Sequence, residues 1–196
     1  CNVECQRQHW RQCHKKRCKS MQTNKKNWDE LANKNLEKLN DVTGMFILGV
    51  RLGTGDKSVP VNHELACKLY EAATKVQKPI AGGHPDAMLH LAIHYERGLG
   101  VDQSHEIAYR YYKSVIDHPC PGEDSAKPAF TALSKYHKEG YEGVEQSAEL
   151  SAKYCAFSMS NPETSEEIQG LEKWWESGGR DQTMSIMSHV EALANK

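Results

Sequence analysis

The feature that most constrains this chain is a self-similar pattern that recurs along it at a nearly constant period. Each copy has a leucine on a first helical segment, a glycine turn, and a small residue followed by two large ones on a second segment. The leucines Leu48, Leu91 and Leu133 lie 43 and 42 residues apart. A period of this size is typical of helical units that must stack on their neighbours to bury an apolar face.

The middle copy is the clearest. Its first helix is predicted from apolar residues at i, i+4 and i+8, namely Ala87, Leu91 and Tyr95. Gly98 and Gly100 end that helix, because glycine adopts the left-handed conformation that costs other residues about 1–2 kcal/mol. Ser104 is the predicted N-cap of the second helix. The buried stripe of that helix comprises Ala108, Tyr111, Tyr112 and Val115.

Two weaker copies flank the middle one. The first aligns Leu48, Gly55, Ala66, Leu69 and Tyr70, and the third aligns Leu133, Gly140, Gly143, Val144, Ser151, Tyr154 and Cys155. Proline-rich segments at 77–85 and 118–128 are predicted to be the loops between units. We therefore predict an all-α fold, an α-solenoid of about three stacked helical hairpins over 41–160, followed by a capping helix pair over 161–196. The capping pair starts either at Asn161–Pro162 or at a capping box from Thr164 to Glu167.

Charge divides the chain into two modules. Residues 1–27 hold eight Lys and Arg against one acid, whereas the remainder has a net charge of −8. We assign 1–20 to a basic head and 21–40 to a linker helix with an apolar stripe at Trp28, Leu31, Leu36 and Leu39. No apolar run approaches the length of about 18 residues that a membrane helix needs.

Cysteine usage favours a reducing compartment, cytoplasmic or nuclear. Four of the seven cysteines lie in the head, and the scattered remainder does not form the pattern of a disulfide framework. Cys67 and Cys155 are expected to be buried on second helices, and Cys120 to lie in an exposed loop. Because the first residue is Cys rather than Met, we expect the chain to be processed or part of a longer protein.

The repeats resemble the Sel-1-like family of tetratricopeptide-like hairpins. The resemblance is carried by Leu91-Ala92-x-x-Tyr95, by Gly98-Leu99-Gly100-Val101 and by Ala108-x-x-Tyr111-Tyr112. The first unit departs from the family pattern with Leu52 at the tyrosine position, and the third departs with His137. The resemblance implies an α-solenoid that acts as an adaptor or scaffold for protein complexes.

The head resembles the C-terminal half of a MYND zinc finger, through Cys1-x3-Cys5-Gln6, Trp10 and His14-Lys15-x2-Cys18. The resemblance implies zinc as cofactor, with Cys1 and Cys5 on one ion, His14 and Cys18 on the other, and the other half of each site upstream. We therefore expect incomplete sites in this chain. His9 and Cys13 are further candidates for an improvised site. We favour the interpretation that the basic residues form a solvated face. Nucleic-acid binding is the alternative.

One set of side chains is a candidate binding site on the repeats. His90, His94 and Arg97 share one side of a helix at i, i+4 and i+7, and are predicted to line a peptide-binding groove. Their counterparts are Ile47, Arg51 and Thr54 in the first unit and Ala132, Tyr136 and Glu139 in the third. The two histidines have the spacing of metal ligands, but no third ligand accompanies them. We interpret them as polar helix surface, and the tyrosines at repeat positions as core.

The sequence predicts a protein–protein interaction scaffold rather than an enzyme, because it has no P-loop, dinucleotide-binding fingerprint or nucleophile elbow. Proteins or peptides are the expected partners; nucleic acid, a membrane or a small-molecule substrate is not expected. The alternative is a fragment of a MYND-containing SET-type lysine methyltransferase, although that family places much of its catalytic core after the finger. A bacterial Sel-1-like β-lactamase-type protein is disfavoured, since such proteins pair cysteines within each repeat.

Overall fold

The structure is a computed structural model that describes residues 42–55, 59–75 and 83–194. The predicted head at 1–20 and linker helix at 21–40, including Cys1, Cys5, His14 and Cys18, lie outside these residues. The described elements are, in order, α2 (Val42–Thr54), α3 (His63–Lys75), α4 (Pro85–Arg97), α5 (His105–Ile116), α6 (Glu123–Glu139), α7 (Ala148–Ser160), α8 (Ser165–Trp174), the π-helical turn η1 (Trp175–Gly179) and α9 (Arg180–Ala194).

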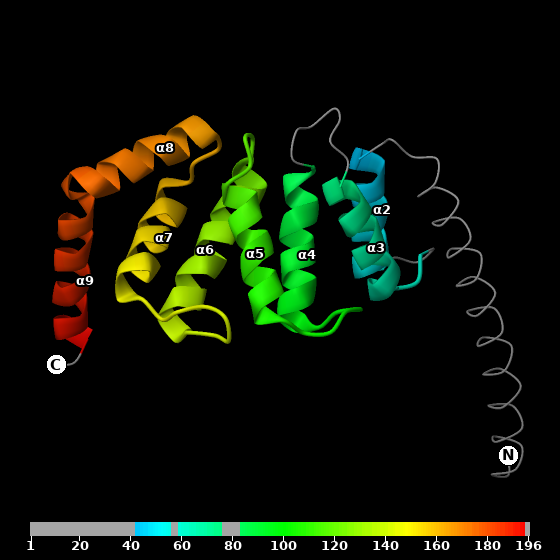
Figure 1. Cartoon of the computed structure of the whole chain (residues 1–196), viewed down its shortest axis with the longest axis horizontal. Helices are drawn as coiled ribbons and strands as arrows, with labels where there is room; N and C mark the ends of the chain where they lie inside the picture. Colours follow the sequence, from blue (N-terminus) through cyan, green and yellow to red (C-terminus); the bar gives the residue numbers. More distant parts are fainter. Residues whose placement is uncertain (1–41, 56–58, 76–82, 195–196) are drawn as a thin grey trace, which may run out of the picture.

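The helices form stacked hairpins, as Figure 1 shows. α2 pairs with α3, α4 with α5, and α6 with α7. Each hairpin packs on the next through α3 against α4 and α5 against α6, and α4 also contacts α6 directly. This arrangement confirms the predicted all-α solenoid.

The core consists of two clusters that meet at α4. Ala87 and Leu91 of α4 belong to the cluster of the first hairpin, and both are fully buried. Met88 and Ala92 belong to the second cluster, which continues through α5, α6 and α7 to the C-terminal helices. Each hairpin therefore buries its apolar faces against its neighbours, as a repeat array requires.

Local sequence signals set the helix ends. Ser104 is the N-cap of α5, and its side chain accepts a hydrogen bond from the amide of Ile107 at 3.3 Å. Ser147 caps α7 in the same way through the amide of Leu150 at 3.2 Å. Gly98 ends α4 in the left-handed conformation, with φ 68° and ψ 38°. The predicted roles of Ser104 and Gly98 are confirmed.

The C-terminal helices close the array at one end. A capping box starts α8: Thr164 accepts from the amide of Glu167, whose carboxylate accepts from the amide of Thr164 at 3.2 Å. Of the two predicted starts, the capping box is therefore the correct one. The chain then turns at Gly178, where φ is 129°, and α9 packs against α7. Trp175 is buried in this corner, with its ring 6.4 Å from that of Phe157.

The structure corrects one predicted loop and one predicted burial. The loop predicted over 118–128 ends earlier, because α6 begins at Glu123 and includes the exposed Pro128. Cys155 is exposed rather than buried. Its counterparts Tyr70 and Tyr112 are covered by the first helix of a following hairpin, whereas Cys155 lies on the last hairpin. Cys67 is buried and Cys120 is exposed, as predicted.

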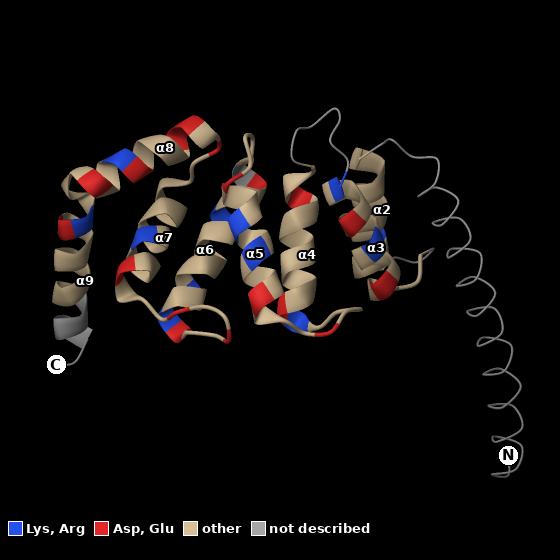
Figure 2. Cartoon of the chain, viewed as in Figure 1, with Lys and Arg blue, Asp and Glu red and all other residues tan. Residues whose placement is uncertain are grey.

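Charges are interspersed over the described helices rather than gathered by sign (Figure 2). Several pair across one helical turn, including Lys68 with Glu64 at 2.8 Å and Lys113 with Asp117 at 3.6 Å. Exposed pairs of this kind contribute little to stability. In the described part of the chain, no helix has the length and apolar character needed to cross a bilayer.

Candidate functional site

The side chain of His94 closes the turn between α4 and α5. Its Nδ1 lies 2.8 Å from the carbonyl oxygen of Leu99, and because a carbonyl only accepts, Nδ1 carries the proton. The thiol of Cys67, on α3 of the preceding hairpin, lies 3.1 Å from the same nitrogen and donates to the same carbonyl at 3.3 Å. His94 is only 5% exposed, so its predicted place on a polar helix surface is wrong.

A related closure recurs one hairpin later. His137 Nδ1 donates to the carbonyl of Glu145 at 2.9 Å, and its Nε2 accepts from the hydroxyl of Tyr109 at 3.2 Å. Tyr109 occupies the position of Cys67, 42 residues on, whereas His137 stands one residue later in register than His94. At both junctions a histidine donates to a carbonyl of the turn. The partner from the preceding hairpin is Cys67 at the first junction and Tyr109 at the second.

Cys67 and His94 are not an activated thiol–imidazole pair. Burial, with a smaller contribution from Glu71, raises the pKa of the Cys67 thiol to about 11. Burial also lowers the pKa of His94, so both groups are neutral near pH 7. A nucleophilic cysteine needs thiolate character and access to solvent. The pair therefore holds the turn and is not equipped for covalent catalysis.

His90 belongs to an aromatic cluster between the first two hairpins. The ring of Phe46 stacks on His84 at 4.8 Å and meets the edge of His90 at 5.4 Å, and Tyr70 lies 5.3 Å from His90. Burial lowers the pKa of both His84 and His90. Among the described residues, no group of three His, Cys, Asp or Glu side chains is placed to hold a metal ion.

The outward side of α2, α4 and α6 carries equivalent side chains that are exposed or partly exposed. We call this set the first-helix face; it comprises Ile47, Val50, Thr54, His90, Ile93, Arg97, Ala132, Lys135 and Glu139. Of the predicted residues, His90 and Arg97 belong to it and His94 does not. Ile93 takes that place, and helical spacing alone does not distinguish it, since both lie within one turn of His90. His94 turns inward, where it contacts Cys67 of α3.

A cavity of about 520 Å³ lies between α6, α7 and α9, and the sequence did not predict it. It is lined by Ser134, Lys138, Gln146, Ala148, Ser151, Cys155 and Met187. Two of these groups are engaged internally: Ser134 donates to the Ser151 carbonyl at 2.8 Å, and Gln146 donates to the Lys138 carbonyl at 2.9 Å. The Lys138 ammonium and the side chains of Cys155 and Met187 remain as lining groups.

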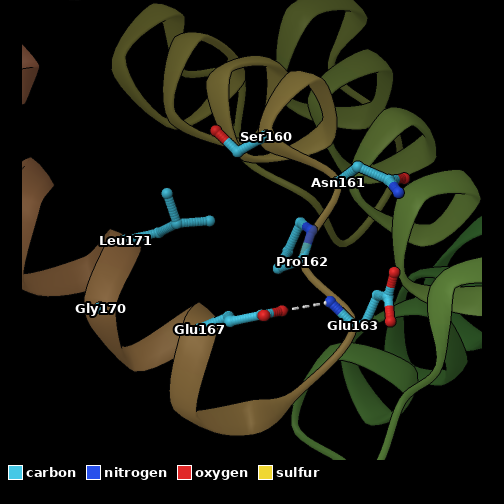
Figure 3. A pocket seen from close by; sticks show the side chains of 7 residues that line it. All are labelled: Ser160, Asn161, Pro162, Glu163, Glu167, Gly170 and Leu171. Carbon is cyan, nitrogen blue, oxygen red and sulfur yellow. Dashed lines mark hydrogen bonds between the residues drawn. The ribbon is translucent and has the colours of Figure 1, made fainter.

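A second pocket, of about 320 Å³, lies where α7 meets α8 (Figure 3). The carboxylate of Glu167 lines it and accepts from the amide of Glu163 at 2.7 Å as well as from that of Thr164. Asn161 ends α7 in the left-handed conformation, with φ 51°. This pocket is thus formed by helix capping, and its acidic group is already occupied.

Comparison with known proteins agrees with the repeat geometry. The Sel1 repeat family model matches residues 42–75 and 85–116, which are the first two hairpins. A Sel1 repeat protein from Oxalobacter formigenes superposes with a TM-score of 0.53 at 25% identity, over 68% of this chain and 90% of that one. A protective antigen of uropathogenic Escherichia coli with an SLR fold gives 0.41 at 17% identity, over 67% of this chain and 33% of that one. No curated protein matches the sequence.

The first two hairpins thus match the Sel1 repeat model, and the fold is similar to that of a solved Sel1 repeat protein. The third hairpin lies outside the matched residues, and its geometry relates it to the others. Ser147 caps α7 as Ser104 caps α5, and His137 closes its turn. The array therefore has three hairpins of one kind in the described part of the chain.

Proposed function

We propose that this chain is a non-enzymatic scaffold that binds a peptide segment of a partner protein along the first-helix face. The observation that carries the proposal is the recurrence of outward side chains at equivalent positions on three adjacent helices. Helical-repeat arrays use such extended surfaces to bind proteins. The direct contact between α4 and α6 makes the surface continuous over these two helices.

The chemistry of the face suggests the partner's character. Ile47 is 53% exposed and Ile93 partly exposed, and they offer apolar contacts near the rings of Phe46 and His90. Arg97 is exposed at the end of α4. A peptide with apolar side chains and a carboxylate complements this surface, since guanidinium groups bind carboxylates in a bidentate manner.

The test is selection of binders from a displayed library of random peptides on the purified full chain. The disrupting variant is Ile93→Glu with Arg97→Glu, which removes an apolar contact and reverses a charge. The matched control is Arg110→Glu with Ser114→Glu on exposed positions of α5. Arg97, Arg110 and Ser114 are exposed, where substitutions usually change stability by less than about 0.5 kcal/mol. Ile93 is partly buried against the core, so circular dichroism and urea denaturation must first show that the α4 variant is folded.

We expect selected peptides to bind the wild type and the α5 control equally, and to lose at least about tenfold in affinity for the α4 variant, or about 1.4 kcal/mol. Enrichment of apolar and acidic residues in the selected peptides supports the proposed chemistry. Binding that is insensitive to the α4 variant but sensitive to the α5 control contradicts the proposal.

For the head, we propose a zinc-binding interaction module in which Cys1 and Cys5 serve one ion and His14 and Cys18 another. The spacing of these residues supports it. Elemental analysis of this chain should find less than two tightly bound zinc ions, and a chain extended upstream should bind about two. Two tightly bound ions in the present chain contradict the half-finger assignment. The SET-type methyltransferase alternative gains no support from any described residue.

A further inference from the structure

α2, the first helix that the structure describes, has a face that its counterparts bury and it does not. Ala87 and Leu91 of α4 are both 0% exposed, as are Ala129 and Leu133 of α6. At the equivalent positions of α2, Gly44 and Leu48 are partly exposed. We call Gly44 and Leu48 the open-end face.

The difference has a structural cause. In α4 and α6, the equivalent face packs against the second helix of the preceding hairpin. That helix is α3 for α4 and α5 for α6. No described element precedes α2. Beside the open-end face, Ile47 is also 53% exposed, and Arg51 is the one charged side chain of α2, whose other large side chains are apolar. A helix that is apolar all round is normally buried all round.

We propose that residues 28–40 of this same chain cover the open-end face of α2. One residue separates the end of this segment from the start of α2. Because the two are covalently linked, the segment is present at a high effective concentration near the open-end face. Its predicted apolar stripe includes Trp28, Leu36 and Leu39. It has the length of α3, which is 13 residues long and covers the equivalent face of α4.

This contact gives the chain a terminal unit of its own and has a consequence for the head. A repeat array needs end units that shield its last apolar surface from solvent. With 28–40 seated on α2, the basic residues of 1–20 are held beside the first hairpin. The zinc-module candidate then lies next to the α2 part of the first-helix face.

The test uses the full chain and measures amide hydrogen exchange by mass spectrometry. The disrupting variant is Leu36→Lys with Leu39→Lys. The matched control, Asn33→Lys with Glu37→Gln, changes the charge by the same amount off the predicted stripe. We expect exchange in α2 to be about tenfold faster in the disrupting variant, while α7 stays within about twofold of wild type. The control should leave both helices unchanged.

Unchanged exchange of α2 in the disrupting variant overturns the proposal. Sedimentation velocity identifies the other possible occupant, a second copy of the chain. If the wild type is dimeric and α2 loses protection on dilution to the monomer, the open-end face is an intermolecular contact and the proposal is wrong. A monomer whose α2 protection does not depend on concentration supports the intramolecular contact.

Discussion

The glycine turns after α4 and after α6 share one sequence pattern but differ in how tightly they pack. Gly98 and Gly140 have nearly the same φ, 68° and 69°, and Gly100 and Gly143 have 74° and 80°. A Cβ added to Gly100 would lie 2.3 Å from the backbone nitrogen of Glu64 at the start of α3. A Cβ added to Gly143 would lie 3.0 Å from Cγ of the Glu106 side chain.

The difference shows that one motif serves two kinds of junction. At the first junction, the backbone of the turn rests on the backbone of the preceding hairpin, and only glycine permits that approach. At the second, a longer turn is stiffened by the bridge between Tyr141 and Val144 and meets a flexible side chain. The first two hairpins should therefore be coupled more rigidly than the second and third.

The largest effect is expected when the close approach is blocked. Gly100→Ala adds left-handed strain of about 1–2 kcal/mol to an overpacked backbone contact that costs about 1–3 kcal/mol, so we expect a loss of about 2–5 kcal/mol. Gly143→Ala should cost only the strain, about 1–2 kcal/mol, because Glu106 can move. Urea denaturation of both variants measures the difference.

Gly122→Ala is the control for these two variants, because φ there is 74° and no atom lies within 4 Å of an added Cβ. Its ψ of 153° lies in a region that is almost restricted to glycine, so its loss of about 1–3 kcal/mol is backbone strain alone. Equal losses for all three alanine variants would show that the junctions do not differ in packing.

Removing core volume at the first junction tests the coupling between the first two hairpins. Leu91 is fully buried in the first cluster, and Leu91→Ala should cost about 2–5 kcal/mol, the range for a core leucine. Because neighbouring repeats stabilise each other, amide exchange should rise in α2 and α3 as well as in α4. A change below about half a kcal/mol would contradict the burial of Leu91 at this junction.

The histidine closures should also differ. His94→Ala leaves the partly buried Leu99 carbonyl with only a thiol donor, so we expect a loss of about 1–3 kcal/mol. His137→Ala exposes the carbonyl of Glu145, a solvent-exposed residue where water replaces the lost donor, and should cost about 0.5–1.5 kcal/mol. Thermal or urea unfolding ranks the two variants, and the reverse order would contradict this explanation.

The sequence predicted the array because its signals are local and repeated. Helical spacing, the glycine of a left-handed turn and a serine N-cap act within a few residues, so Leu91, Gly98 and Ser104 were assigned correctly. Burial that depends on a distant partner was not predictable in this way. His94 turns inward because that side of α4 packs on α3, where it contacts Cys67.

The cavity beside α9 shows the same limit at the other end of the array. Cys155 repeats a position that is buried in earlier units, but its surroundings depend on how α8 and η1 direct α9. The kink at Gly178, where φ is 129° and ψ is −7°, sets that direction, and a pair of adjacent glycines predicts a break without giving its angle.

The smallest expected effect is a dependence of stability on pH. It arises at the first junction, because that junction contains three histidines with lowered pKa values. Burial is the main cause that lowers the pKa of His84, His90 and His94 in the folded chain below the usual value of about 6.5. Asp86 opposes the shift at His84 and His90, whereas the backbone of Leu99 opposes it at His94. Unfolding releases these side chains to bind protons more readily.

Below about pH 6.5 the unfolded chain therefore binds more protons than the folded one, so stability is fully present above that pH and falls as pH decreases toward the lowered values. Urea midpoints measured from pH 7.5 to 5.5 should decline for the wild type. In His90→Gln the decline should be smaller, because one of the three contributing groups no longer titrates, and amide exchange should place the acid-induced opening in α2 to α4. A decline of the same size in His90→Gln and wild type would show that this ring does not contribute to the pH dependence of the junction.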